Sequence, residues 1–236
     1  MSAPVGSGSG RRRVFARLDR QAVRAHLVDV NDGVIATAGV VEGLLAAGAS
    51  VTTIVVAALG AMVGGGMALG GMKYSEAADD RDAEIAVLAE ERRLHELQPD
   101  EELAELAALY EDKGLSPALA RQVAEELSTK DALLHHAQVE HGITLDDDSP
   151  SPGGTAVLAG SAFMIGAAVP LVVSATAPAG WRIPLTVLAV VAALSGTATM
   201  VARLGGMSVG RTVLRTVTIG VLTMSLTLAG GLLFDL

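Results

Sequence analysis

Residues 51–72 read VTTIVVAALGAMVGGGMALGGM, an apolar stretch that contains no charged side chain. The hydrocarbon core of a bilayer is crossed by a helix of about 20 such residues. Because lipid offers no hydrogen-bond partner to the backbone, this stretch predicts a transmembrane helix. Further windows of similar length hold few charges: residues 27–48, 154–176, 183–204 and 210–234. The sequence therefore predicts an all-α membrane protein with five transmembrane helices.

Charged residues divide the chain into two parts of opposite charge. Residues 76–148 hold 21 of the 26 acidic residues and 6 of the 17 basic ones, a net charge of −15, whereas the rest of the chain is +6. Because residues 76–148 are so acidic, they predict a water-exposed domain between the second and third spans. No long basic face accompanies it, which argues against nucleic-acid binding. The chain has no cysteine, which excludes disulfides and thiolate metal sites.

The expected organisation has four parts. Residues 1–24 form a basic, Gly/Ser-rich N-terminus that is expected to be disordered, residues 25–74 carry two spans, residues 75–150 form the acidic helical domain, and residues 151–236 carry three spans. Arginines precede the first span and flank the last, and the positive-inside rule places such ends in the cytoplasm. We therefore expect a multi-pass protein of the inner (plasma) membrane, with its N-terminus and acidic domain in the cytoplasm.

The acidic domain is expected to contain several helices. Residues 75–97 are rich in Ala, Glu and Arg, which favour helices, and Pro99 predicts a break before a new helix at residues 100–112. Gly114 is expected to end that helix. Two further helices are predicted, over residues 117–128 and 129–141.

Acidic side chains lie inside the first predicted span. An ionisable group in the bilayer is costly unless it faces a cavity or a partner, so Asp32 and Glu42 are candidate functional groups. The alternative for Asp32 is a position at the membrane surface, and for Glu42 it is a structural contact between helices. Asp29 lies in the same span, and with Glu42 it is a candidate for a transport pathway.

Methionines recur in the second span at a spacing of five residues, which fits no single helical face. Methionine is usually a packing residue. A thioether beside a carboxylate nevertheless favours a transition metal over magnesium or calcium. Met67 is therefore a candidate metal ligand and Met72 a candidate for the pathway, and the glycines around Met67 predict close approach of another helix.

Helical spacing groups several potential ligands in the acidic domain. Glu102 and Glu105 share one helix face, and Glu91 on the preceding helix can fold back beside them across the Pro99 break. His136 and Glu140 lie one turn apart on the last helix. Carboxylates with imidazole suit Fe²⁺, Mn²⁺, Co²⁺ or Zn²⁺. The alternative is an ordinary solvated helix face, on which acid pairs are common.

The chain resembles the vacuolar iron transporter family and its bacterial relatives over nearly everything after about residue 20. The first two spans carry the resemblance in Asn31-Asp32-Gly33-Val34-Ile35 and Met67-Ala68-Leu69-Gly70-Gly71. In the acidic domain it continues through Glu91-Arg92-Arg93, Pro99-Asp100-Glu101-Glu102-Leu103 and His136-Ala137-Gln138-Val139-Glu140. The order of these segments, with a charged insert after the second span, makes the resemblance specific.

The resemblance implies a homodimer of five-helix protomers that moves a divalent metal in exchange for protons. It implies that Asp32 and Met67 bind metal in the membrane, and that Glu91, Glu102, Glu105 and Glu140 bind metal in the cytoplasmic domain, where His136 takes the place of a sulfur ligand. The expected cargo is Fe²⁺, with Mn²⁺, Co²⁺ and Zn²⁺ as further candidates. The expected function is metal export from the cytoplasm in support of ion homeostasis.

Three positions depart from the family pattern, because Gln21, Ala25 and Leu94 stand where the family has acidic residues. Asp29 and Glu42 are hypothesised to compensate. The departures keep two alternatives open: a manganese or cobalt exporter with little iron activity, and a non-transporting metal sensor or scaffold. No Ser-His-Asp set and no phosphate-binding glycine loop occurs, so no enzyme is expected.

Overall fold

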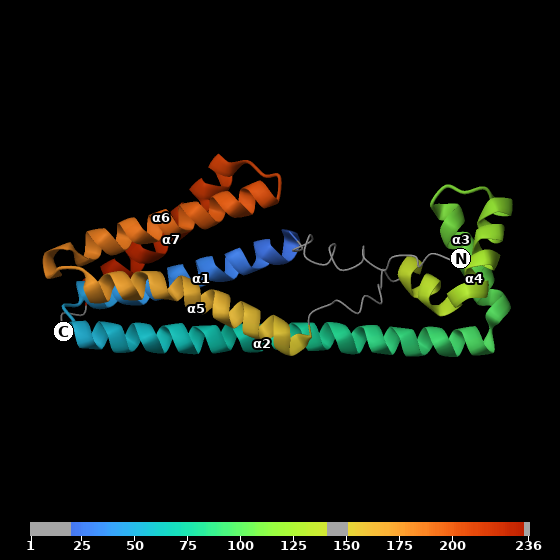
Figure 1. Cartoon of the computed structure of the whole chain (residues 1–236), viewed down its shortest axis with the longest axis horizontal. Helices are drawn as coiled ribbons and strands as arrows, with labels where there is room; N and C mark the ends of the chain where they lie inside the picture. Colours follow the sequence, from blue (N-terminus) through green and yellow to red (C-terminus); the bar gives the residue numbers. More distant parts are fainter. Residues whose placement is uncertain (1–19, 141–150, 234–236) are drawn as a thin grey trace, which may run out of the picture. The chain divides into compact units, whose positions relative to one another are not determined.

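The computed structural model describes residues 20–140 and 151–233. In that part of the chain the elements are α1 (Arg20–Ala46), α2 (Val51–Leu97), α3 (Pro99–Asp112), α4 (Pro117–Glu140), α5 (Pro152–Thr176), the 3-10 turn η1 (Ala179–Trp181), α6 (Arg182–Leu204) and α7 (Val209–Leu232) (Figure 1). They form two compact units. The apolar unit comprises Met1–Lys73 and Gly154–Leu236, and the acidic unit comprises Tyr74–Gly153.

Four helices in the described part of the chain are long and apolar enough to cross a membrane. They are α2, α5, the segment Ala179–Leu204 that contains α6, and α7. The first helix, α1, has 27 residues, but Asp29, Asp32 and Glu42 interrupt its apolar sequence. It begins at Arg20, so residues 20–24 are helical and do not belong to the N-terminal tail that the sequence predicted, whose residues 1–19 lie outside the described part.

The helix α1 is central to the apolar unit. On one side, Val34 and Ala38 pack against Val190 and Leu194 of α6 and against Met224 of α7. On the other side α1 packs against α2 and α5, in a cluster that consists of Val41, Ile54, Ala58 and Leu171. Helices α1, α6 and α7 also contact one another pairwise. The acidic side chains of α1 are therefore positioned by helices on several sides.

Glycines bring α5 close to both α1 and α2. A Cβ atom at Gly166 would collide with the carbonyl oxygen of Val30 on α1. A Cβ at Gly70 of α2 would lie 2.9 Å from the carbonyl oxygen of Ala156 on α5. A Cβ at Gly160 of α5 would lie 2.7 Å from the carbonyl oxygen of Gly66 on α2. Small residues permit this backbone approach in membrane helices. The close approach predicted from the glycines around Met67 is confirmed, and α5 is the helix that approaches.

A Gly166→Ala substitution is expected to destabilise the protein. The added methyl group meets the backbone of α1, which cannot rotate away as a side chain can, and overpacking of this kind typically costs about 1–3 kcal/mol. Thermal unfolding in detergent should show a lower midpoint than the wild type. Gly196→Ala is the matched control, because nothing lies within 4 Å of the added Cβ there. Equal midpoints for the two variants would contradict the packing of α5 on α1.

In the acidic unit, α3 and α4 pack on each other around Leu106, Ala107 and Ala124. The break at Pro99 is confirmed, because α2 ends at Leu97 and α3 begins at Pro99. Gly114 follows α3 with a φ of +100°, a conformation that glycine adopts without strain. The chain therefore turns where the sequence predicted.

Two helix boundaries differ from the prediction. A break between residues 128 and 129 is wrong, because α4 is continuous over Pro117–Glu140 and the Thr129 hydroxyl donates to the carbonyl oxygen of Glu126. No proline or glycine follows Pro117 within this helix, so nothing interrupts its hydrogen bonds. The second span and residues 75–97 likewise form one helix, α2, because no helix breaker lies between them.

Candidate metal site in the acidic unit

Two carboxylates and one imidazole meet in the acidic unit. One ligand atom from each of Glu91, His95 and Glu102 can be chosen so that all three lie within 4.8 Å of one another. Glu91 and Glu102 are 5% and 4% exposed, and His95 is partly buried. Three nitrogen and oxygen ligands at this spacing suit a first-row divalent metal ion.

The local sequence explains how these side chains meet. Glu91 and His95 lie one turn apart on α2, so both face the same side of the helix. The chain reverses at Pro99, and Glu102 lies in the first turn of α3. The apolar residue Leu106, one turn after Glu102 and 1% exposed, packs into the core of the unit and fixes the orientation of α3. A short helix reversal thus brings three ligands together from one continuous segment.

A cavity of about 630 Å³ adjoins the cluster at His95. Its lining comes from all three helices of the unit: Arg92, His95, Glu96, Pro99, Asp100, Leu103, Ser128 and Leu133. Asp100 and Glu96 contribute negative charge to this cavity. Arg92 adds one positive charge to the same lining, so with His95 neutral the lining carries a formal charge of −1 where a cation would approach His95 from water.

Neighbouring charges do not all point into the site. The Arg93 guanidinium donates to both carboxylate oxygens of Glu90, at 2.9 and 2.6 Å. This pair is exposed, and its hydrogen bonds lower the pKa of Glu90 below the ordinary value for a glutamate. Glu90 is therefore engaged by Arg93, and the adjacent Glu91 is left as the acid that faces the cluster.

Two other residues predicted for this domain, Glu105 and Glu140, are not among the three that meet. Glu105 lies one turn after Glu102 and is exposed. Glu140 is the last residue of α4 and is also exposed, although it takes part in a polar interaction. His136 lies on α4, but its side chain falls outside the described residues. The structure thus joins Glu91 with Glu102 and adds His95, which lies next to Leu94 and was not among the predicted ligands.

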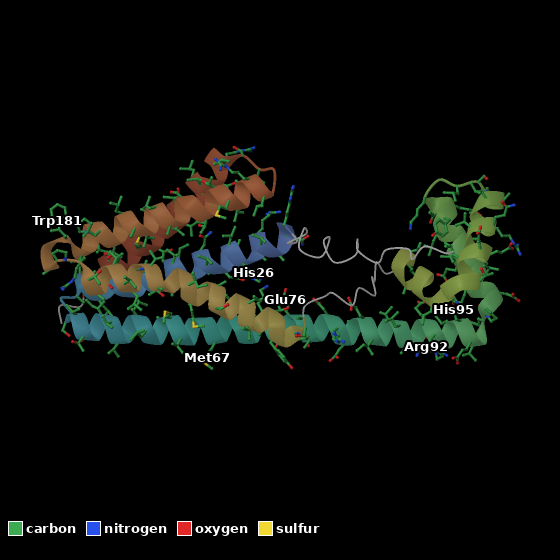
Figure 2. All side chains as sticks on the ribbon, viewed as in Figure 1. His26, Met67, Glu76, Arg92, His95 and Trp181 are labelled. Carbon is green, nitrogen blue, oxygen red and sulfur yellow. The ribbon has the colours of Figure 1, made fainter. Side chains whose placement is uncertain are left out.

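The predicted membrane ligands are exposed on the apolar unit. Asp32 on α1 is exposed, and on α2 the Met67 side chain is 73% exposed (Figure 2) and that of Met72 is 59% exposed. The other two acids of α1 are buried. Asp29 is 7% exposed and lies 3.5 Å from Nδ1 of His26, which the sequence analysis did not single out, and Glu42 is 1% exposed. Asp32 and Glu42 therefore do not share one environment.

Comparison with known proteins shows the family to which the chain belongs. The sequence model of the VIT family matches residues 23–232. A relative from Acanthamoeba castellanii named "Vacuolar iron transporter" is 32% identical over 216 residues, which cover 87% of this chain and 79% of the relative. Proteins of this family are transporters and not enzymes. Both the family match and the relative extend across the apolar and the acidic unit, and the chain therefore belongs to the VIT family of membrane metal transporters.

Proposed function

We propose that the protein exports ferrous iron from the cytoplasm in exchange for protons. The observation that supports this proposal is the cluster of Glu91, His95 and Glu102, three side chains that could hold a metal ion inside the acidic unit of a VIT-family chain. The relative named for iron transport supports Fe²⁺ as cargo. Mn²⁺ and Co²⁺ are alternative cargoes for the same ligands, because carboxylate and imidazole bind all three ions.

In the proposed topology five helices cross the membrane. The helix α1 is the additional span, since its 27 residues exceed the bilayer thickness. The basic residues Arg20, Arg24, Arg203, Arg211 and Arg215 lie near the helix ends that this topology assigns to the cytoplasm. This proposed topology places the protein in the inner (plasma) membrane and the acidic unit in the cytoplasm.

We further propose that the working form is a homodimer. An exposed carboxylate on a transmembrane helix cannot face lipid without a large cost, so the face that carries Asp32 needs a partner or water. On α2, added Cβ atoms at Gly60, Gly64 and Gly71 would meet nothing within 4 Å. These glycines recur with Met67 at spacings of three and four residues, which place them on one exposed face. A second copy packed on this face would cover it.

The proposed cycle uses the acid groups twice. Ionised carboxylates bind metal and protonated ones release it, because the metal and the proton compete for the same oxygen atoms. The net charge of −15 over residues 76–148 raises the local cation concentration, most strongly at low ionic strength. The cluster in the acidic unit captures the ion, and Asp32 with Met67 carries it through the bilayer.

Purified protein in liposomes tests this function. Ferrous iron added outside should enter vesicles that contain the protein in an outward-facing cytoplasmic orientation, and the rate should rise with an opposing proton gradient. Mn²⁺ and Co²⁺ in parallel vesicles give the preference among cargoes. Metal binding without flux of any of these ions would contradict transport and support a sensor or scaffold.

A further inference from the structure

Buried polar residues mark the contact between α1 and α6. The Thr197 hydroxyl on α6 donates to Oδ1 of Asn31 on α1. The two helices run in opposite directions (Figure 1). Eleven residues make about three helical turns, so Glu42 lies on the same face of α1 as Asn31, and Thr186 lies on the same face of α6 as Thr197. This register places Glu42 and Thr186 at the same level of the contact.

A small pocket lies at this level. Its volume is about 80 Å³, and it is lined by Glu42 of α1, Ile183 and Val187 of α6, and Val221, Met224, Ser225 and Leu228 of α7. Both Glu42 and Thr186 are fully buried, at 1% and 0% exposure. Neither carboxylate oxygen of Glu42 and no hydroxyl of Thr186 has a hydrogen-bond partner among the described residues. The pocket thus holds a buried acid without a partner.

The side chains that line the pocket indicate which ligand it can bind. Beside Glu42, the polar atoms available are one hydroxyl and one thioether, from Ser225 and Met224. A divalent ion held by this single carboxylate would keep a net positive charge in an otherwise largely apolar lining, which is costly to bury. A proton needs a single oxygen, and a carboxylic acid is tolerated in an apolar pocket where its anion is not.

Within residues 20–140 and 151–233, no opposite charge pairs with the Glu42 carboxylate. The lining residues from α6 and α7 are not ionisable. Arg182 lies at the start of α6, but its Nε has no hydrogen-bond partner among the described residues, so it does not bind Glu42 through that atom. The acids Asp29 and Asp32 lie ten or more residues away along α1, about 15 Å or more of helix rise.

We propose that Glu42 and its pocket between α1, α6 and α7 form a proton-binding site that is separate from the metal path at Asp32. This inference rests on the proposed exchange of metal for protons. The metal then travels along the exposed face of α1, and the proton is held on its buried face. Because both groups lie on α1, a shift of this helix that opens one site can close the other.

Chemical labelling of the wild-type protein tests the site without any transport assay. Dicyclohexylcarbodiimide, an apolar reagent, modifies protonated carboxyl groups within membranes. Mass spectrometry should find modification at Glu42 that declines as the pH is raised, that persists in Asp32→Asn, and that disappears in Glu42→Gln. Absence of modification at Glu42 from acid to alkaline pH would overturn the proposal.

Flux measurements separate this proposal from the proposed function. In liposomes, Glu42→Gln should still move metal, but the metal rate should no longer respond to the proton gradient, and proton movement should fall to the level of protein-free vesicles. A Glu42→Gln protein whose metal flux responds to the gradient as the wild type does would overturn the proton site while leaving transport intact. If the wild type moves no metal, the proposed function is wrong. The labelling experiment still shows whether Glu42 binds a proton, so the two proposals fail separately.

Discussion

Replacement of Asp32 by Asn is expected to reduce metal flux by about 100-fold or more. One unit charge about 4 Å from another contributes about 4 kcal/mol at an effective dielectric constant of 20. Each 1.4 kcal/mol corresponds to a factor of ten. The amide keeps the shape of the carboxylate but removes its charge. A metal ion that leaves water for the bilayer then has only the Met67 thioether from this pair, which is a weak ligand. Flux into liposomes at a fixed metal concentration measures the loss.

The effect should fall on transport and not on folding. Asp32 is exposed and its side chain makes no hydrogen bond with another described residue, so the thermal midpoint of the Asp32→Asn protein should match that of the wild type. Asp79→Asn is a suitable control, because Asp79 is an exposed aspartate of α2 in the acidic unit and lies outside the cluster. Full flux in a correctly folded Asp32→Asn protein would remove Asp32 from the metal path.

Local signals account for the parts of the fold that the sequence predicted. The span at residues 51–72, the reversal at Pro99 and the turn at Gly114 each depend on a few consecutive residues. The predicted break inside α4 falls between Ser128 and Thr129. A hydroxyl that bonds back to the helix backbone does not end a helix, so that prediction was wrong.

The candidate site depended on contacts that spacing alone does not reveal. Helical spacing relates Glu102 to Glu105, but only the fold shows that Glu102 turns inward beside His95 and that Glu105 faces water. Position in the sequence groups Glu42 with Asp29, because both lie in one predicted span with Asp32. Ten residues rotate a helix by about 280°, and Glu42 accordingly faces α6 and α7 while Asp32 is exposed.

A Glu102→Gln substitution is expected to weaken metal binding in the acidic unit by at least about tenfold to 100-fold, because loss of a group that only orients a ligand already costs that much. The change removes one of the two carboxylates in the cluster, while Glu91 and His95 remain on α2. Calorimetric titration of the full-length protein with Mn²⁺, which does not oxidise under these conditions, measures the affinity. Glu84→Gln is the matched control, because Glu84 is an exposed glutamate of the same unit outside the cluster.

Thermal unfolding gives a second readout for the same variant. A ligand that binds only the folded state stabilises it by about 2.7 kcal/mol at 100 times its dissociation constant, so Mn²⁺ should raise the unfolding midpoint of the wild type and of Glu84→Gln. The same Mn²⁺ concentration should raise the midpoint of Glu102→Gln much less, since fewer sites are filled. If Glu102→Gln and Glu84→Gln bind Mn²⁺ equally and are stabilised equally, the cluster does not hold the metal. The exposed acids of the unit, which include Glu105 and Glu140, then become the better candidates for metal ligands.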